Sequence, residues 1–333
     1  MGTTRQDALW WQRSKREPAD LGALGKYFEI CNRSDGKSSD TIEWYNQTLK
    51  QFEQFLVENR KSTNIADIGE PEVREYIIYM QGRRRWPDNP HVSLNCGPLS
   101  AISIQTYVRA LRAFFRWLWR EGYTESNQLA YLRPPKAPGK LVEVLTPQEI
   151  SDIFRSIDTR TPVGARNFAI LMLFLDRGLR CSELRCFTLD DINMDGRYLK
   201  VMGKGGKERI VPFGGSAEKA LLRYSLRFRP EPFNPSIRCF FLTPDGKPLT
   251  RNCVYLVIRR IALKSGVSRL HPHLCRHTFA TNYLINGGDV FSLQQILGHT
   301  TLEMVKRYVT LASGHVTAQH RKFSPMDRLE LKK

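Results

Sequence analysis

The stretch that decides the fold and the chemistry runs from residue 271 to residue 308 and reads HPHLCRHTFATNYLINGGDVFSLQQILGHTTLEMVKRY. It brings four side chains that suit phosphate chemistry into one short segment, in the order His273, Arg276, His299 and Tyr308. An arginine offers paired donors to phosphate oxygens, and a histidine exchanges a proton near neutral pH. A tyrosine hydroxyl can act as a nucleophile. The stretch therefore predicts a site that binds and attacks a phosphate.

The spacing of these side chains favours three helices. His273 and Arg276 stand three residues apart, so both can project from one end of a helix. The glycine pair in LINGGD ends that helix, and Gly298 ends the next one. His299 then lies at a turn, and a further helix carries Tyr308. We expect the two helix–turn junctions to deliver His299 and Tyr308 to one neighbourhood.

Two further groups that a phosphate would attract stand upstream. Arg180 lies in RGLRCSEL, and Glu183 follows three residues later on the same helical face. Lys204 lies in GKGGKER, a glycine-rich turn between two alternating segments at 198–202 and 209–213. Alternation on both sides of such a turn predicts a β-hairpin that carries Lys204 at its tip.

Together these motifs resemble the tyrosine recombinases, the phage-integrase and Xer family. HPHLCRHTFA, the L-G-H box and a tyrosine nine residues after it are similar to the C-terminal signature of that family. RGLRCSEL resembles its first arginine box, and GKGGKERIVP resembles its hairpin lysine. A single H-x-x-R would be a weak signal, but these boxes follow the order of the family. The resemblance covers about residues 20–310.

The resemblance implies an α-helical N-terminal DNA-binding domain of the SAM-like, core-binding type. It also implies a mixed α/β, mainly helical catalytic domain with a small antiparallel sheet. The segment YLRPPKAPGKLVE, rich in proline, is typical of a linker between the two. We therefore expect these divisions: a mobile arm at 1–19, the core-binding domain at 20–130, the linker at 131–143, the catalytic domain at 144–310, and a tail at 311–333 that docks on a neighbouring subunit.

Local signals place helix starts in both predicted domains. In the front domain, SSDT at 38–41 is an N-cap cluster, and Ser100 or Ser103 caps another long helix. After the linker, Thr146 with Glu149 three residues later forms a capping box.

The charge of the chain suggests a polyanionic partner. The formal net charge is +18, from 51 Lys and Arg against 33 Asp and Glu. Residues 1–137 hold 20 basic and 16 acidic residues, a net of +4, and residues 138–333 hold 31 and 17, a net of +14. The excess lies mainly in the half with the signature. Charge of this kind favours nucleic acid, although a solvated basic surface has the same composition.

Other features of the composition indicate the cytoplasm and no membrane. No apolar run is long enough to span a bilayer, and the N-terminus lacks the apolar core of a signal peptide. The seven cysteines are odd in number and have no paired spacing, which favours free thiols in a reducing compartment.

A stripe of arginines follows one helix of the predicted front domain. These residues stand three, four and four positions apart without an acidic residue at helical spacing, so they share one face: Arg109, Arg112, Arg116 and Arg120. Such a face is either solvated or lies along an anion. In the resembling family, the front bundle clamps DNA, so we expect this arginine stripe to bind DNA.

The resemblance also assigns chemical roles at the site. Tyr308 would be the nucleophile, and Arg180 and Arg276 would hold the non-bridging oxygens of the scissile phosphate. His299 would donate a further hydrogen bond to the phosphate. The product would be a 3′-phosphotyrosyl linkage with a free 5′-hydroxyl, so that strands could be rejoined without ATP, a cofactor or a metal ion.

Three more residues would assist this reaction. Lys204 would protonate the leaving 5′-oxygen, and His273 would accept or donate a proton at the tyrosine side. Glu183 would support the site from behind the residues that contact the phosphate. The resemblance further implies a homotetramer on two DNA duplexes at a specific recombination site, with a related recombinase or accessory proteins as further partners.

Other functions fit the same residues. A type IB-like topoisomerase or a hairpin telomere resolvase would use the same chemistry, and an accessory protein would bind DNA without cleaving it. The role could be that of a phage, a transposon, an integron or a chromosome-dimer system.

Competing kinds of site fit less well. The His and Cys residues of HPHLCRH do not all face one ion, and no second cluster follows at zinc-finger spacing. GKGGKE lacks the spacing of a phosphate-binding P-loop. The acids Asp190, Asp191 and Asp195 crowd into one loop, which is typical of a solvated turn.

Two departures from the family pattern concern neighbours of the site. Val309 and Thr310 stand where the family often has a histidine after its tyrosine. Cys181 and Cys275 each adjoin a predicted site arginine, so a reactive thiol there would make activity sensitive to oxidation, whereas a buried thiol would be inert.

Overall fold

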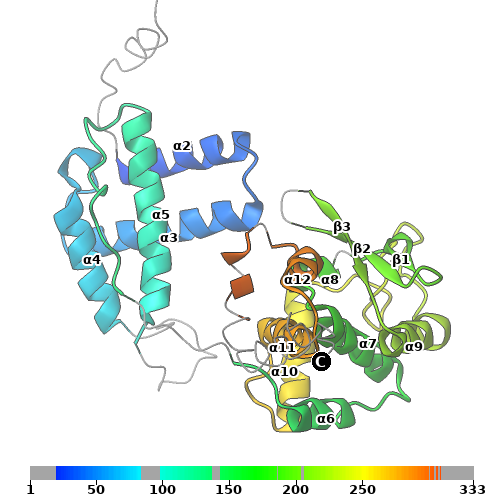
Figure 1. Ribbon diagram of the computed structural model, residues 1–333. Coiled ribbons are helices and arrows are strands. Elements are labelled where there is room, and N and C mark those ends of the chain that lie inside the picture. Colours follow the sequence, from blue (N-terminus) through cyan, green and yellow to red (C-terminus); the bar gives the residue numbers. More distant parts are fainter. Residues whose placement is uncertain are drawn as a thin grey trace, which may run out of the picture. The chain divides into compact units, whose positions relative to one another are not determined.

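A computed structural model of the chain divides it into two compact units, residues 1–140 and 141–333 (Figure 1). The structure describes the following residues: 20–83, 98–136, 143–185, 187–203, 206–299, 301–303, 305, 306 and 308. The predicted arm at 1–19 and tail at 311–333 lie outside these residues, and so do residues 84–97.

The described residues of the first unit form helices joined by loops, without a β-strand. Its elements are α2 (Leu21–Ser34), α3 (Ser39–Glu58), the short 3₁₀ helix η2 (Ile65–Asp67), α4 (Glu70–Gly82) and α5 (Ala101–Arg120). Ser38 and Ser100 cap α3 and α5, because each side chain accepts a hydrogen bond from a backbone N–H in the first turn. Both capping predictions are therefore confirmed, with Ser100 rather than Ser103 at the N-cap of α5.

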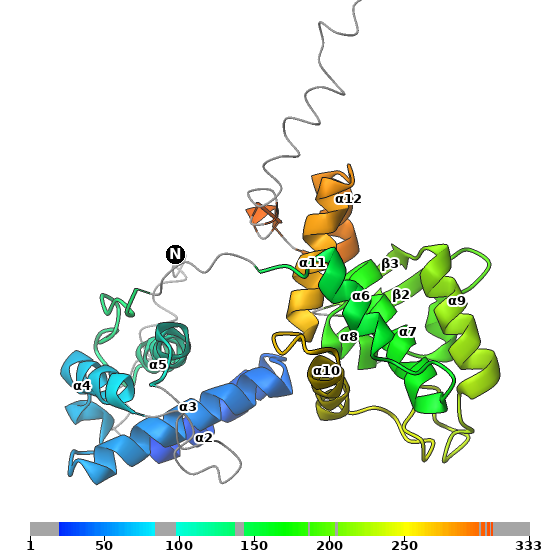
Figure 2. The same ribbon diagram turned by 90° about the horizontal axis from the view of Figure 1, so that it is seen from below.

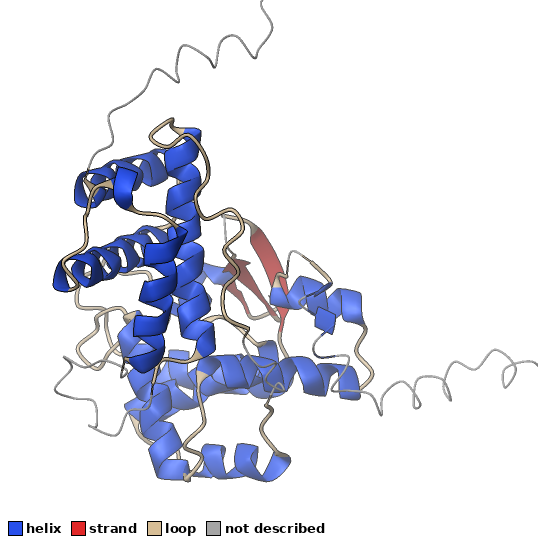
Figure 3. Ribbon diagram, turned by 90° about the vertical axis from the view of Figure 1, so that its left-hand side faces the viewer, coloured by secondary structure: helices blue, strands red, loops and turns tan. Residues whose placement is uncertain are grey.

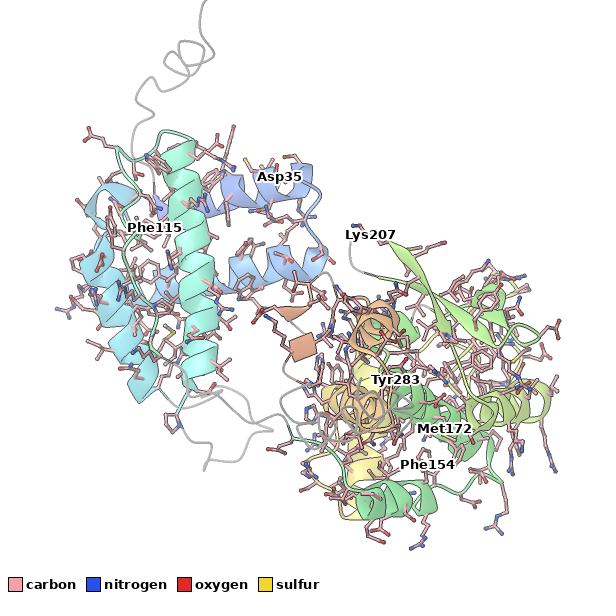
Figure 4. All side chains as sticks on the ribbon, viewed as in Figure 1. Asp35, Phe115, Phe154, Met172, Lys207 and Tyr283 are labelled. Carbon is pink, nitrogen blue, oxygen red and sulfur yellow. The ribbon has the colours of Figure 1, made fainter. Side chains whose placement is uncertain are left out.

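Aromatic side chains form the centre of this first unit. Phe28 of α2 meets Phe114 of α5 edge to face with ring centroids 5.3 Å apart, and Phe52 of α3 packs at 5.1 Å from Tyr76 of α4. Phe115 extends from α5 into the same core (Figure 4). Each fully buried aromatic or aliphatic side chain contributes about 1.5–3 kcal/mol, so this core fixes α5 and leaves its opposite face to solvent.

The second unit combines helices with one small sheet among its described residues (Figure 3). Its elements are α6 (Pro147–Arg155), α7 (Pro162–Arg177), α8 (Cys181–Arg185), η3 (Leu189–Asp191), β1 (Ile192–Asn193), β2 (Tyr198–Met202), β3 (Glu208–Pro212), α9 (Gly215–Arg223), the π-helical turn η4 (Tyr224–Phe228), α10 (Arg251–Ser265), α11 (Pro272–Ile285) and α12 (Val290–Leu297).

The predicted hairpin is present, and a third strand extends it. The strands are antiparallel in the order β1-β2-β3, with Tyr198 opposite Pro212. The two-residue β1 lacks the alternation that would reveal a strand in the sequence. Apolar residues of β2 and β3 belong to the same core cluster as α7 and α9, which lie beside the sheet (Figure 2). This arrangement holds the base of the hairpin rigidly against the helices.

The helix boundaries predicted around the site are also confirmed. Thr146 and Glu149 form the capping box of α6, since each side chain accepts a hydrogen bond from the other residue's backbone N–H. Asp289 caps α12, and Gly298 ends it with φ of 62°. Among the described residues, no helix is long and apolar enough to cross a membrane.

Gly178 ends α7 in the left-handed conformation, with φ of 58°, and a side chain there would also collide with its neighbours. A Cβ would lie 2.6 Å from Cδ1 of Phe279. Gly266 ends α10 in the same conformation but has open space around it. We expect Gly266→Ala to lower the free energy of unfolding by about 1 kcal/mol. Gly178→Ala should lower it by about 2–4 kcal/mol, because overpacking adds to the backbone strain.

Calorimetric unfolding of the two variants beside the unaltered protein would measure both changes. Equal losses in the two variants would mean that the collision with Phe279 adds nothing to the cost of the backbone strain.

Candidate active site

Arg276 is a deeply buried charged residue of the predicted site, with 4% of its surface exposed. Its guanidinium donates to the carbonyl oxygen of Gly178 at 2.6 Å and to that of Leu297 at 2.8 Å. These carbonyls end α7 and α12, where backbone acceptors have no partner inside the helix. Burial, together with the charge of Arg180, lowers the pKa of Arg276 to about 10, so it stays charged at neutral pH.

His299 follows Gly298 at the turn after α12 and is 8% exposed. Its Nε2 lies 2.8 Å from a guanidinium nitrogen of Arg276, which has only protons to donate, so Nε2 is the acceptor. Burial and the neighbouring positive charges of Arg276 and Arg180 lower the pKa of His299 to about 4. A neutral ring that accepts at Nε2 carries its proton on Nδ1, and that buried atom has no partner among the described residues. The site thus holds an unused N–H donor, a group that a phosphate oxygen would satisfy.

Glu183 joins Arg180 to a second arginine, Arg209. The Glu183 side chain is 3% exposed, and it accepts from the backbone N–H of Arg180 at 2.8 Å and from its guanidinium at 2.7 Å. Arg209 of β3 donates to both oxygens of the same carboxylate, at 2.9 and 3.0 Å. Burial alone would raise the pKa of Glu183, but the bonds and charges of Arg209 and Arg180 outweigh it and lower that pKa. The carboxylate is therefore ionised and fixes both arginines.

Tyr308 is buried in the same neighbourhood, with 4% of its surface exposed. Its hydroxyl lies 2.9 Å from Nδ1 of His277 on α11. Its ring is nearly parallel to that of His299, with an interplanar angle of 12° and centroids 6.5 Å apart. Tyr308 is also close enough to Arg276 to affect the pKa of that side chain. The structure thus brings together Tyr308, His299, Arg276 and, through Glu183, Arg180.

The two remaining predicted site residues are His273 and Lys204. His273 begins α11 with its side chain exposed, and partial desolvation with the positive charges of Arg276 and His271 lowers its pKa. Lys204 lies outside the described residues. Gly203 before it is described, and so are Gly206 and Lys207 after it, with Lys207 just before β3 (Figure 4).

Sequence reasoning missed two residues of this neighbourhood, Arg209 and His277. The signal for His277 was available, because it stands four residues after His273 and so lies one helical turn further on the same face. Arg209 gave no such signal. Its partner Glu183 is 26 residues away, and only the folded hairpin brings them together.

The competing sites considered from sequence gain no support in the described part of the chain. No group of three or more His, Cys, Asp or Glu residues there could hold a metal ion. Asp190 pairs with Arg238 at 2.8 Å, and Asp191 accepts from Thr188. Cys181 and Cys275 are both buried, and burial raises their pKa values, that of Cys275 to about 12, so neither thiol is reactive.

The arginine stripe lies on the solvent side of α5. All four guanidinium-bearing residues are exposed and line one groove of the first unit, together with Lys37 and Asp35. Two of them have partners, since Arg112 donates to the carbonyl oxygen of Ala130 at 3.3 Å and Arg120 lies 3.7 Å from Glu121. Glu121 and Asp35 are thus acids close to the stripe, although neither stands at helical spacing within it, and the face remains strongly positive.

Models of two protein families match the chain. The phage integrase family matches residues 143–315, just over half of the sequence, and the phage integrase N-terminal SAM-like domain matches residues 26–125. The chain belongs to the phage integrase family. Both predicted domain types, the SAM-like helical domain and the catalytic domain with its small antiparallel sheet, are thereby confirmed.

Relatives in this family support the same identification. The tyrosine recombinase XerD of Staphylococcus saprophyticus is 30% identical over 304 residues, which cover 91% of this chain and 98% of that protein. The tyrosine recombinase XerC of Oceanobacillus iheyensis is 32% identical over 306 residues, with 91% and 95% covered.

Solved structures of the family share the fold. The integrase of the transposon Tn1549, bound to transposon right end DNA, matches with a TM-score of 0.68 at 20% identity, over 87% of this chain and 94% of that one. The XerH recombinase, bound to a palindromic difH substrate, matches with a TM-score of 0.66 at 20% identity, over 90% and 84%. This integrase-family chain is a tyrosine-type site-specific DNA recombinase, and neither a topoisomerase nor a non-cleaving accessory protein is favoured.

The low pKa of His299 predicts a pH dependence of stability. An unfolded histidine has a pKa near 6.5, so between about pH 6.5 and pH 4 the unfolded chain binds a proton that the folded chain does not. Acidification across this window should therefore destabilise the protein, by up to about 3 kcal/mol from this residue. His299→Gln cannot titrate, so its thermal midpoint should fall less steeply over the same range. Parallel midpoint curves for the two proteins in calorimetry would contradict this prediction.

Proposed function

We propose that this recombinase cleaves and rejoins double-stranded DNA with Tyr308 as its nucleophile. The observation that carries the proposal is the meeting of four groups at one buried place: Tyr308, His299, Arg276 and Arg180. They come from three separate segments of the second unit, and each supplies a different need of phosphoryl transfer. A tyrosine buried only for packing would not require two arginines and a neutral histidine around it.

The chemistry follows from the positions of these groups. A scissile phosphate that enters the site would be held by the guanidinium groups of Arg276 and Arg180, which neutralise charge as it grows on the non-bridging oxygens. The unused N–H of His299 would donate one more hydrogen bond. The Tyr308 oxygen then attacks phosphorus, and a 3′-phosphotyrosyl bond replaces the bond to the 5′-oxygen. The ester conserves the bond energy, so another 5′-hydroxyl can reverse the step.

We assign the remaining parts of the reaction as the family pattern implies. Lys204 would protonate the leaving 5′-oxygen from the hairpin turn, and His273 would assist proton transfer at the tyrosine side. Glu183 would keep Arg180 and the hairpin in register through Arg209. Four copies of the chain would work together on two duplexes at a specific site, with partner recombinases or accessory proteins, and the residues beyond 310 would dock on a neighbouring copy.

Substitution of the nucleophile tests the proposal. Tyr308→Phe should bind DNA with unchanged affinity but form no covalent adduct with a nicked suicide substrate, since it lacks the attacking oxygen. Tyr283→Phe is a matched control, because Tyr283 also lies in the second unit, on α11. That variant should form the adduct at the normal rate. The reaction should also proceed in EDTA. Adduct formation by the Tyr308 variant would assign the nucleophile elsewhere.

The arginine stripe has a proposed role of its own, as a clamp on the DNA backbone. Arg109, Arg112, Arg116 and Arg120 form an exposed cationic row along α5, and phosphates repeat along a duplex with comparable regularity. Arginines that touch phosphates release condensed counterions, which makes affinity fall with salt. Each lost contact therefore reduces the slope of log affinity against log salt by about 0.9.

A double substitution in the stripe measures these contacts. Arg112→Gln with Arg116→Gln should weaken binding to all sequences and make the salt slope shallower by about one to two units. Glutamine keeps the helix propensity, so the thermal midpoint should stay nearly the same. The control is Arg33→Gln with Arg74→Gln, which removes equal charge from α2 and α4. Equal slopes for both double variants would show that the stripe does not touch DNA.

A further inference from the structure

We propose that His277 is a catalytic residue that accepts the proton of the Tyr308 hydroxyl as this oxygen attacks the DNA. The proposal rests on the assignment of Tyr308 as nucleophile. It gives the tyrosine-side proton transfer to a residue other than His273, which the family pattern favours for that side.

The contact between the two side chains is the main observation. Nδ1 of His277 lies 2.9 Å from the hydroxyl oxygen of Tyr308, within the range in which a base abstracts a proton directly. The two ring centroids are 5.5 Å apart and the planes are inclined by 48°. Tyr308 is 4% exposed, so little bulk water reaches the contact to take the proton instead.

The other two histidines of the site are less suited to this task. The Nε2 of His299 already accepts a hydrogen bond from Arg276, and the low pKa of this ring makes it a poor proton acceptor. His273 stands one helical turn before His277, and its side chain is exposed at the start of α11. His277 lies further inside the helix, directly after the phosphate-binding Arg276. One rigid turn of α11 therefore presents a cation for the phosphate and a base for the nucleophile.

The proton and electron balance of the step is complete. For Nδ1 to accept, the neutral imidazole of His277 carries its proton on Nε2. As the Tyr308 oxygen forms its bond to phosphorus, its O–H bond breaks and the proton moves to Nδ1. The bond from phosphorus to the 5′-oxygen breaks at the other side, and that oxygen takes a proton from the proposed acid, Lys204. In rejoining, a 5′-hydroxyl gives its proton back to Lys204 as its oxygen attacks phosphorus, and His277 returns its proton to the departing tyrosine oxygen.

The charge next to His277 in the chain bears on the imidazolium that forms in this step. Arg276 adjoins His277 in the chain, and its positive charge opposes a second positive charge nearby. The scissile phosphate supplies a negative charge beside these groups and offsets this repulsion. Proton transfer is thereby coupled to the arrival of substrate.

The test compares two substitutions of His277 in the full chain, with single-turnover adduct formation on a nicked suicide duplex as the readout. His277→Asn places an amide oxygen near the position of Nδ1, so it can still accept a hydrogen bond from Tyr308 but cannot take its proton. His277→Ala removes both functions. We expect both variants to bind the duplex normally and to form the adduct about 10²–10⁴-fold more slowly. Added imidazole should restore part of the rate of His277→Ala alone.

The pH profile of the same reaction separates proton transfer from positioning. The rate of the unaltered protein should fall as the pH decreases, because protonated His277 cannot accept a second proton. In His277→Asn this acid limb should disappear or change its midpoint. His271→Asn is a matched control, because His271 adjoins the same helix with its ring exposed, and this variant should keep the normal rate and profile.

Two outcomes would overturn the proposal. One is a His277→Asn rate within threefold of the unaltered protein, which would make His277 a positioning residue only. The other is an unchanged acid limb in that variant, which would place the base at His273 or His299. Failure of the underlying assignment looks different, because the unaltered protein would then form no adduct at Tyr308. A thermal midpoint close to normal shows that each variant is folded, and His277→Gln replaces His277→Asn if the latter is not.

Discussion

The catalytic unit depends on the buried guanidinium of Arg276. Removing such a charge from water is costly unless its donors are satisfied, and here the last carbonyls of two helices accept from it. Those carbonyls would otherwise be orphans at the ends of α7 and α12. The donors of the arginine and the carbonyl acceptors at the helix ends therefore satisfy each other. As a result, the cation that we propose for the phosphate is already fixed by hydrogen bonds within the chain, so that little reorganisation would remain for the reaction itself.

A second buried charge, the carboxylate of Glu183, connects the arginines of the site to the sheet. Arg209 leaves β3, reaches Glu183 with both of its terminal nitrogens, and donates from Nε to the carbonyl oxygen of Ile296 in α12. The base of the hairpin, the arginine box and the turn before His299 are thus linked through one side chain. The base of the hairpin is thereby anchored to the groups that we propose to hold the phosphate.

The sequence predicted the local parts of this arrangement well and the distant pairings poorly. Caps such as Thr146 and Ser100, the hairpin around Lys204 and the boxes in family order all depend on neighbours in the chain. The contacts of Tyr308 with His277 and of Glu183 with Arg209 join residues 31 and 26 positions apart, and they depend on how helices and strands pack. Strand β1, with two residues, is too short to show a period.

The burial of Tyr308 against its own α11 has a consequence for assemblies of several copies. Each copy carries its proposed nucleophile beside the arginine and histidines of the same chain. Two defective copies, one without its tyrosine and the other without Arg276, could not supply each other's missing side chain. A mixture of these two variants should therefore show no complementation.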